Sequence, residues 1–402
     1  MVRGSSASNR RHVVIWTSRC PVVALRAFVT GGAGFIGRHL VRVLLDGGWR
    51  VKAFILESER SHLPKDANLE PVVGDITKPS TLRGELDDAD AVFHLAALVD
   101  SWVRDPQDYI RVNVEGTGHV VDESLRAAVP RFLFTSSMSG IGVTPGIVMR
   151  EDSPPGKSFG PYEGSKADAE RLVAKAVRER GLPAITLIPS IVIGPGDTRN
   201  TGKFLLSYVN GDFPGTFAES SVLPVVDADD VARAHLAAYH HGQLGERYII
   251  SGENVLWGDL LRMASVASGT PMPSRHIGGR ALRFAARTGE LFSRVTRSPP
   301  RLPSWLADFL LTGASMDNGK SVRELGMTYR PIHQSIRDSI AWFRDEGLFR
   351  GPPLPAAPER EVLVPVENPR VGAETVFELG IPETSSRDAP PNRRPKPPEG
   401  SA

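Results

Sequence analysis

Gly31-Gly32-Ala33-Gly34-Phe35-Ile36-Gly37 sets the architecture of this chain of 402 residues. An apolar segment at residues 27–30, predicted to be a strand, ends at these glycines. Residues 35–45 then carry apolar side chains at helical spacing. A glycine triplet between a strand and a helix is a far stronger signal than the same glycines elsewhere, so an ordinary glycine-rich turn is the weaker interpretation.

The chemistry of a dinucleotide explains each glycine of this turn. Gly31 allows a tight turn, Gly34 lets the backbone approach a pyrophosphate, and Gly37 permits close packing of the helix on the sheet. The free N–H groups at the start of the helix, near Phe35 and Ile36, would bind the phosphate charge. The stretch therefore predicts a dinucleotide-binding turn.

Strands and helices alternate from this turn onward, and this alternation predicts a doubly wound parallel sheet, the Rossmann α/β class, with helices on both faces. The predicted strands cover residues 51–56, 70–73, 91–95, 131–135 and 184–188, and the predicted helices cover 107–128 and 162–180.

The alternation fades after Pro195, where helices dominate. Residues 229–241 and 247–250 predict one more helix and strand, and further helices are expected at 256–268, 280–292, 305–311 and 333–346. We expect a Rossmann domain of residues 22–194 plus about 224–252, and a smaller, mostly helical substrate lobe of about 195–223 plus 253–349. Residues 1–21 are expected to be a flexible leader, and the Pro-rich residues 350–402 a disordered tail.

Composition narrows the class of protein. The net charge of +2 gives no basic surface of the kind that nucleic acid requires, so no nucleic-acid partner is expected. Cys20 is the only cysteine, which excludes an intramolecular disulfide and fits the reducing cytoplasm. No segment is long and apolar enough to predict a transmembrane span, and no spaced set of ligands predicts a metal.

Tyr162 and Lys166 form the clearest candidate catalytic pair, in Tyr162-Glu163-Gly164-Ser165-Lys166. Their spacing of four places both side chains on one face of a helix. A free tyrosine has a pKa near ~10, and a neighbouring ammonium is expected to lower it toward the working range of a proton shuttle.

The Gly-x-x-Gly-x-x-Gly spacing and the Tyr-x-x-x-Lys pair resemble those of the extended short-chain dehydrogenases/reductases, the NAD-dependent epimerase/dehydratase superfamily. Three further stretches match in the family's order, and the resemblance covers about residues 24–348. They are Gly74-Asp75-Ile76, His94-Leu95-Ala96-Ala97, and the run from Pro189 to Pro195, which includes Ile191.

The resemblance implies roles for these residues. Asp75 would accept a hydrogen bond from the adenine amino group, and Ile76 would also contact the cofactor. Leu95, Ala96 and Ala97 would wall the cofactor, and Pro189 and Ile191 would face the nicotinamide.

The same resemblance assigns the catalytic set. Tyr162 would exchange the proton and also contact the cofactor, and Lys166 would bind the nicotinamide ribose. Ser137, with Ser136 as the fallback, would hold the substrate oxygen. Asn113 would anchor a water in the proton relay, although a satisfied polar residue inside a helix is the alternative.

The choice between NAD and NADP stays open. NAD-preferring members place an acid at the end of the second strand, where this chain has Ile55. The arginine of many NADP-preferring relatives is replaced by Leu56. Glu57 and Arg60 lie just beyond and favour opposite choices.

The substrate-facing positions favour an apolar substrate. Nucleotide-sugar enzymes of the superfamily commonly read Asn-Val-Tyr-Gly-Pro after the sixth strand, and Ile191 stands here in place of that asparagine. The pattern is similar to that of the dihydroflavonol reductase and hydroxysteroid dehydrogenase branch. We therefore expect an NAD(P)-dependent oxidoreductase that transfers a hydride to or from a carbonyl or alcohol carbon. A nucleotide-sugar epimerase or dehydratase and a non-catalytic NAD(P)-binding regulator are the alternatives.

Two parts of the sequence are candidates for interactions with a membrane surface or with a second copy of the chain. The basic segment 280–297 has apolar residues at helical spacing, which fits either packing on its own lobe or weak association with a membrane surface. Homodimers formed through the helices predicted at 107–128 and 162–180 are common in the family.

Overall fold

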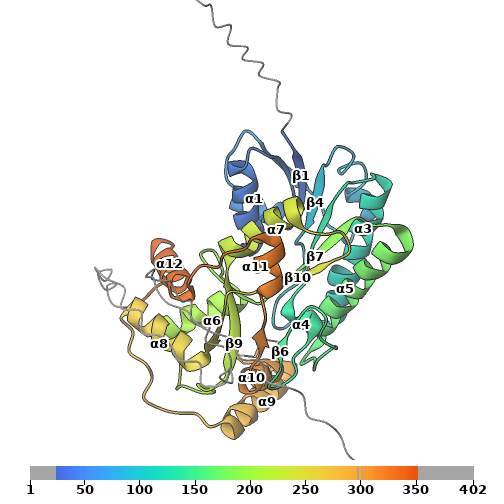
Figure 1. Ribbon diagram of the computed structural model, residues 1–402. Coiled ribbons are helices and arrows are strands. Elements are labelled where there is room, and N and C mark those ends of the chain that lie inside the picture. Colours follow the sequence, from blue (N-terminus) through green and yellow to red (C-terminus); the bar gives the residue numbers. More distant parts are fainter. Residues whose placement is uncertain (1–23, 297, 301, 352–402) are drawn as a thin grey trace, which may run out of the picture. The chain divides into compact units, whose positions relative to one another are not determined.

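The computed structural model describes residues 24–351 except 297 and 301 (Figure 1). The predicted leader, and the predicted tail beyond residue 351, lie outside the described residues.

A seven-stranded parallel sheet forms the centre of the fold, in the strand order β3-β2-β1-β4-β5-β7-β10. The chain winds outward in opposite directions from β1 and β4, where Val29 lies level with Phe93. Ligands of such sheets bind at the carboxyl ends of the strands, at this switch point. The strands are β1 (Arg26–Thr30), β2 (Arg50–Ile55), β3 (Leu69–Val73), β4 (Ala91–His94), β5 (Phe132–Thr135), β7 (Ala184–Pro189) and β10 (Arg247–Ile250).

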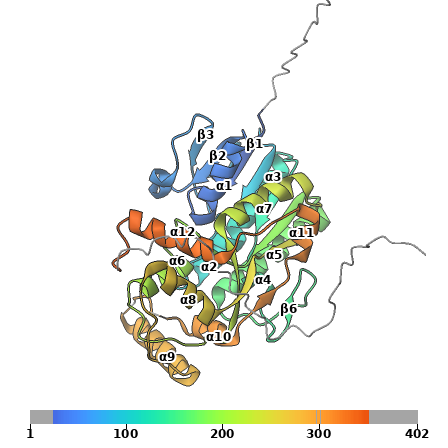
Figure 2. The same ribbon diagram turned by 60° about the vertical axis from the view of Figure 1, so that its left-hand side comes forward.

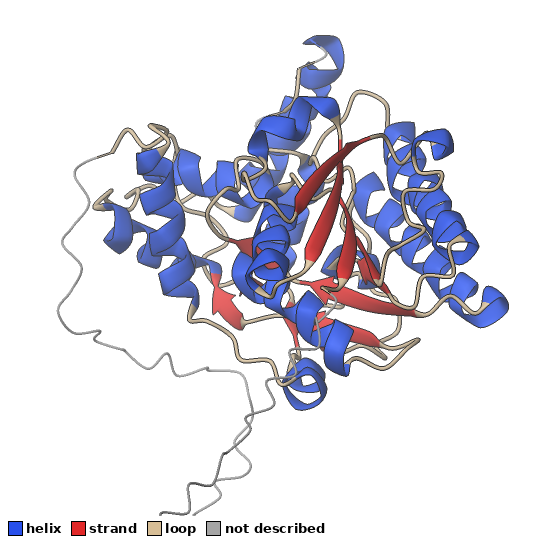
Figure 3. Cartoon of the chain, turned by 90° about the horizontal axis from the view of Figure 1, so that it is seen from above, coloured by secondary structure: helices blue, strands red, loops and turns tan. Residues whose placement is uncertain are grey.

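Helices cover both faces of this sheet, as Figure 3 shows. On one face lie α1 (Phe35–Asp46), α7 (Ala228–His241) and the short α11 (Gly319–Leu325), and on the other lie α3 (Thr117–Arg126) and α5 (Pro161–Arg180). Successive strand residues point to opposite faces, so Phe28 packs toward α3 and α5 while Val29 packs toward α1 and α7. Both are fully buried, and the prediction of a doubly wound Rossmann fold is confirmed.

The helix predicted at 107–128 is divided into three parts. The short α2 (Gln107–Tyr109) leads into a π-helical turn, η3 (Ile110–Gly116), and α3 follows. Gly116 lies against Ile76, where a Cβ would come within 2.8 Å of the isoleucine Cδ1. A π turn changes the direction in which side chains project, and it is frequent at functional sites.

A smaller lobe has its own sheet and core (Figure 2). In this sheet β8 (Ile191–Ile193) pairs parallel with β9 (Val222–Asp227), and β11 (Glu253–Leu256) pairs antiparallel with β9. Its core includes Tyr208, Phe217, Trp257, Ile336 and Phe343. Its helices are α6 (Asn200–Val209), α8 (Trp257–Ser268), α9 (Gly279–Thr296), α10 (Ser304–Thr312) and α12 (Ile332–Asp345).

The predicted division into domains is more interleaved than the sequence indicates. β8 and most of β9 lie in segments expected for the Rossmann domain but pair within the small sheet, whereas α7 and β10 return to the large sheet. α11 lies in the segment expected for the lobe but packs against α7 and β10. The remaining elements are α4 (Met138–Ile141), the pair β6 (Val148–Met149) and β12 (Ser315–Met316), and the 3₁₀ turns η1 (Glu57–His62) and η2 (Pro79–Thr81).

Candidate active site

The glycine turn packs directly against the loop that follows β4. Gly31 has a φ of +69°, and a Cβ there would come within 2.8 Å of the Ala96 nitrogen. A Cβ at Gly37 would come within 2.0 Å of the Gly31 carbonyl oxygen. Backbone atoms cannot move aside as a flexible side chain can, so both positions require glycine.

The start of α1 is suited to an anion. No side chain caps this helix, and its first turn has no acidic residue. Gly34 donates its N–H to the Gly31 carbonyl at 2.9 Å, and a Cβ at Gly34 would meet only that oxygen, at 3.1 Å. Gly34, Phe35, Ile36 and Gly37 therefore fit the pyrophosphate of a dinucleotide, which would satisfy the helix N–H groups.

A buried histidine network fixes the loop after β4. The Thr30 hydroxyl lies 2.7 Å from His94 Nδ1, and the same oxygen accepts the backbone N–H groups of Leu95 and Ala96, each at 3.2 Å. Leu95 and Ala96 are residues predicted to wall the cofactor, and the network holds their backbone beside the glycine turn.

The neighbouring hydroxyls determine the tautomer of His94. The Thr117 hydroxyl donates to the Asn113 carbonyl at 2.6 Å, so it accepts from His94 Nε2 at 2.9 Å, and Nδ1 accepts from Thr30. Burial, assisted by the positive charge of Lys166, lowers the pKa of His94 to about 3. His94 is therefore neutral. His94 is part of the stretch His94-Leu95-Ala96-Ala97 that resembles the family pattern. Its hydrogen-bond partners, Thr30 of β1 and Thr117 of α3, are distant in the sequence, so the pattern alone does not reveal that His94 positions this loop.

Asp75 and Ile76 follow β3 at the carboxyl end of the parallel sheet. Asp75 Oδ1 accepts the backbone N–H and the hydroxyl of Thr77 at 2.9 and 2.8 Å, while Oδ2 lies 3.8 Å from the Lys78 ammonium. Ile76 is buried against Gly116. These contacts fix the turn, and the contact of Asp75 with adenine stays a prediction.

Lys166 is hydrogen-bonded to the end of strand β5. It is only 4% exposed, and its ammonium donates to the Thr135 carbonyl at 2.9 Å, above the ring of Phe134. Burial lowers the pKa of Lys166 to about 8, although the nearby carboxylate of Glu170 opposes this shift.

Tyr162 does not show the lowered pKa that the sequence predicts. Burial raises the pKa of Tyr162 to about 12, and a hydrogen bond with the Ser137 side chain only partly opposes this. Lys166 does not contribute to the shift. Its ammonium is bound to the Thr135 carbonyl instead, so the expectation that this pair alone lowers the tyrosine pKa is wrong.

The two serines after β5 have different partners. Ser136 is buried and donates to Glu170, which forms an ion pair with Arg247 at 2.7 Å. Ser137 caps α4 by accepting the Ser139 N–H at 3.2 Å and is the serine that bonds Tyr162. This geometry favours Ser137 over Ser136 as the residue that would hold a substrate oxygen.

The Asn113 side chain joins two elements of the site. Its Oδ1 accepts the Leu98 N–H at 2.7 Å, and its Nδ2 donates to the Leu98 carbonyl at 3.0 Å and to the Ser165 hydroxyl at 2.8 Å. The amide is thus satisfied within the protein and connects the loop after β4 to α5. Its water-anchoring role stays a prediction.

The loop after β8 is fixed by two residues of α1. Arg38 donates to the Gly196 carbonyl and His39 Nε2 to the Pro195 carbonyl, each at 2.8 Å. They are the first and second residues after Gly37, and their position beside the glycine turn is the signal that could have revealed them. Pro189 ends β7, and partly buried Ile191 begins β8.

A carboxylate that the sequence analysis did not consider, that of Glu59, lies beside the end of β2. Ile55 is buried, Leu56 is exposed, and Glu59 Oε2 accepts the Leu56 N–H at 3.3 Å. Glu59 in η1 thus reaches back to the position where NAD-preferring members hold an acid.

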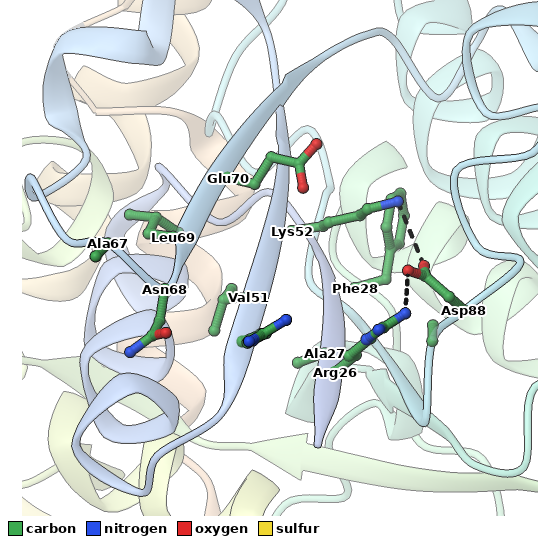
Figure 4. A pocket seen from close by; sticks show the side chains of 12 residues that line it. Arg26, Ala27, Phe28, Val51, Lys52, Ala67, Asn68, Leu69, Glu70 and Asp88 are labelled. Carbon is green, nitrogen blue, oxygen red and sulfur yellow. Dashed lines mark hydrogen bonds and ion pairs between the residues drawn. The ribbon is translucent and has the colours of Figure 1, made fainter. Parts of the chain in front are cut away.

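A separate hollow of about 360 Å³ lies at the amino ends of β1, β2 and β3 (Figure 4). Its lining includes Arg26 and Lys52, which both pair with Asp88, at 2.5 and 3.4 Å. The candidate site lies at the opposite ends of the strands, so this hollow is not part of it. Within residues 24–351, leaving out 297 and 301, no group of His, Cys, Asp or Glu is arranged to hold a metal.

Fold and site together define a Rossmann protein with a glycine-rich turn before α1, a Tyr-Lys pair on α5, and a serine hydrogen-bonded to the tyrosine. The model of the NAD dependent epimerase/dehydratase family matches residues 27–251, and this chain belongs to that family.

Two curated relatives align over most of their length. One, 32% identical, is named a putative dihydroflavonol 4-reductase of Synechocystis sp., and the alignment covers 80% of this chain and 96% of the relative. The other, 31% identical, is named sterol demethylase protein B of Methylococcus capsulatus, with coverages of 81% and 100%.

Solved structures agree with the fold. The crystal structure of gox2253 is 33% identical, with a TM-score of 0.69, and the match covers 81% of this chain and 99% of that one. A Thermus thermophilus UDP-glucose 4-epimerase in complex with NAD is 23% identical, with a TM-score of 0.64 and coverages of 80% and 99%, and shows the fold alone. The predictions of the superfamily, its reductase branch and an NAD(P)-dependent oxidoreductase are confirmed.

Proposed function

We propose that this enzyme transfers a hydride between a nicotinamide dinucleotide and the carbonyl or alcohol carbon of a hydrophobic substrate. The observation that carries the proposal is a buried apolar cluster that begins directly after Ser137, the serine that bonds Tyr162.

Side chains from several separate parts of the chain form this cluster, which we propose as an apolar wall of the substrate site. Met138 and Ile141 belong to a buried cluster that starts directly after Ser137, and Phe159, Ile191 and Phe309 pack against it. The rings of Phe159 and Phe309 meet edge to face, with centroids 5.9 Å apart. A sugar nucleotide presents many hydroxyls and would need polar partners here, whereas a steroid-like or flavonoid-like ring system suits an apolar wall.

The lobe contacts the loop after β4 through α10. Trp305 Nε1 donates to the Ser101 carbonyl at 3.0 Å, in the loop after β4, and Tyr109 donates to the Asp100 carbonyl at 2.5 Å in the same loop. These bonds connect the loop to α10 and to α2. They support a substrate site bounded by the β4 loop, α5 and α10.

The residues support a division of labour in the reaction. When bound, the nicotinamide supplies or accepts the hydride. Ser137 would orient the substrate oxygen, and Tyr162 would exchange a proton with it. Because burial keeps the pKa of Tyr162 near about 12, its hydroxyl is protonated at neutral pH, which suits donation to a carbonyl oxygen in the reductive direction.

The names of the two curated relatives support an apolar substrate, since one is named for a dihydroflavonol and the other for a sterol. A nucleotide-sugar epimerase or dehydratase is less well supported, because Ile191 lies at the wall where those enzymes commonly have asparagine. A regulator without turnover would have no need of Tyr162, Lys166 and Ser137 together.

One experiment separates these functions. The purified enzyme is incubated with NADH or NADPH together with one candidate substrate at a time. The candidate substrates are a steroid ketone, a dihydroflavonol and UDP-glucose. Oxidation of one reduced cofactor for each apolar ketone consumed is the expected result. Turnover of UDP-glucose alone, without net oxidation of the cofactor, would refute the proposal. Binding of cofactor without any turnover across a broad panel of apolar ketones would favour the regulator.

The compartment and the assembly are proposals of the same kind. The single cysteine, Cys20, supports a reducing compartment such as the cytoplasm. Dimerisation through the exposed sides of α3 and α5 is proposed from the family resemblance. Sedimentation of the purified protein tests it directly.

A further inference from the structure

Helix α9 has two apolar faces, and only one of them is covered. Leu282, Ala286 and Ser293 are buried and attach the helix to the lobe. Phe284, Leu291 and Phe292 are 71%, 65% and 70% exposed. Steps of seven and eight residues are about two helical turns, so these three large side chains share one outward face. Such side chains gathered on one surface are a typical mark of an interaction site.

The position of α9 leaves this outward face accessible. In both Figure 1 and Figure 2 the helix lies at the margin of the lobe, beyond α10. The sequence allowed either packing of this segment on its own lobe or association with a membrane. Leu282 and Ala286 pack in the core of the lobe, as the first of these two interpretations predicts. The opposite face of the helix, which carries Phe284, is not covered by any of the described residues.

Positive charge accompanies the exposed apolar face. Between residues 275 and 296 the sequence has five arginines, one glutamate and neither lysine nor aspartate. Arg280, Arg283 and Arg287 are all exposed and lie at helical spacing along α9. Arg283 pairs with Asp308 at 2.7 Å, and Glu290 accepts hydrogen bonds from the backbone N–H and the hydroxyl of Ser304, so Glu290 does not neutralise the arginine row.

We propose that the outward face of α9 docks onto a membrane surface that contains anionic lipid. Exposed phenylalanines and leucine would enter the boundary between headgroups and acyl chains, and the arginines would pair with lipid phosphates. A second copy of this chain suits the face less well, because a two-fold contact would bring its arginine row against an identical row. No helix among the residues that the structure describes is long and apolar enough to span a bilayer.

The docking would place the substrate lobe at the source of an apolar substrate. α10 packs on α9 and carries Trp305 and Phe309, which bound the proposed substrate site. This consequence rests on the proposed function, whereas the docking itself does not. Vesicle binding therefore stands or falls independently of any measured turnover.

The test is flotation of the full-length protein with vesicles at low salt and at about 0.5 M salt. Phosphatidylcholine vesicles are compared with vesicles that also contain about 30% phosphatidylglycerol. We expect binding to the anionic vesicles that weakens at high salt. The double variant Phe284→Ser/Phe292→Ser should bind at least about tenfold more weakly, and so should Arg280→Glu/Arg287→Glu at low salt.

Matched substitutions elsewhere on the surface provide the controls. Val266→Ser/Leu244→Ser removes two apolar side chains that are also exposed, and Arg171→Glu/Arg262→Glu reverses two exposed arginines. Both controls should keep wild-type vesicle binding, and NADH binding in solution should be unchanged in all four variants. Three results would overturn the proposal: no vesicle binding by the wild type, equal losses in the controls, or an oligomer in solution that Phe284→Ser/Phe292→Ser dissociates.

Discussion

The cofactor-binding half and the substrate lobe are built in different ways. In the first, seven contiguous residues, Gly31 to Gly37, form the turn, and the residues predicted to contact the cofactor follow the ends of consecutive strands. In the lobe, β8, β9 and β11 pair across gaps of about 30 residues each and meet helices from still later in the chain. The first half is thus encoded by local motifs, and the second by long-range pairing. We expect changes in the first half to abolish binding or chemistry, and changes in the lobe to tune substrate affinity.

The largest effect should come from Tyr162→Phe. Removing the proposed proton donor should lower kcat by about 10²- to 10⁴-fold, since that is the usual contribution of a general acid. NADH affinity should stay at the wild-type value, because the cofactor turn is untouched. Steady-state kinetics and fluorescence titration check the two halves of this prediction. A Tyr162→Phe enzyme that retains full kcat would remove Tyr162 from the chemistry.

A methyl group in the glycine turn should produce the next effect. A Cβ at Gly37 would meet the Gly31 carbonyl oxygen at 2.0 Å, and such overpacking usually costs about 1–3 kcal/mol. Gly37→Ala should therefore weaken NADH binding about tenfold to 100-fold. The matched control is Gly164→Ala, where a Cβ meets nothing within 4 Å in the interior of α5. The control should stabilise the protein by about 0.5–1 kcal/mol.

Lys166 should destabilise the cofactor-free fold at neutral pH. Its pKa falls from 10.5 in the unfolded chain to about 8 in the fold, so the unfolded state binds more protons between these values. Wild-type stability should therefore rise by roughly 2–3 kcal/mol from about pH 8 to about pH 10.5, and Lys166→Met should lack this rise. Urea unfolding of both proteins across this range tests the sign. Parallel pH profiles would show that Lys166 is not depressed by burial.

The smallest effect should come from the lobe. Trp305→Phe keeps an aromatic side chain but loses the hydrogen bond to the Ser101 carbonyl, which is worth about 1 kcal/mol. KM for an apolar ketone should rise about fivefold, with kcat and NADH affinity unchanged. A loss of NADH binding instead would show that the lobe shapes the cofactor site as well.

The sequence predicted the glycine turn, the doubly wound parallel sheet and the helix that carries Tyr162 and Lys166. Each of these features depends on residues that are close in the chain. It missed β8 and β9, since β8 has only three residues and follows β7 without a turn signal. It also missed the true partners of two site residues. Lys166 donates a hydrogen bond to the Thr135 carbonyl, and His94 is hydrogen-bonded to Thr30. The members of each pair are far apart in the sequence and come together only when the sheet has formed.

The sign of the tyrosine pKa shift shows the same limit. Spacing on a helix brings Tyr162 and Lys166 to one face, but it carries no information about burial. In the fold, desolvation outweighs every favourable contact and raises the pKa of Tyr162 to about 12.

The most direct test of the account is a fluorescence titration of the purified protein with NADH and, separately, with NADPH, after removal of any copurified cofactor. We predict saturable binding of at least one of them by the wild type and equally tight binding by Tyr162→Phe. If neither cofactor bound the wild type, the start of α1 would not be a dinucleotide site, and the proposed oxidoreductase would be contradicted.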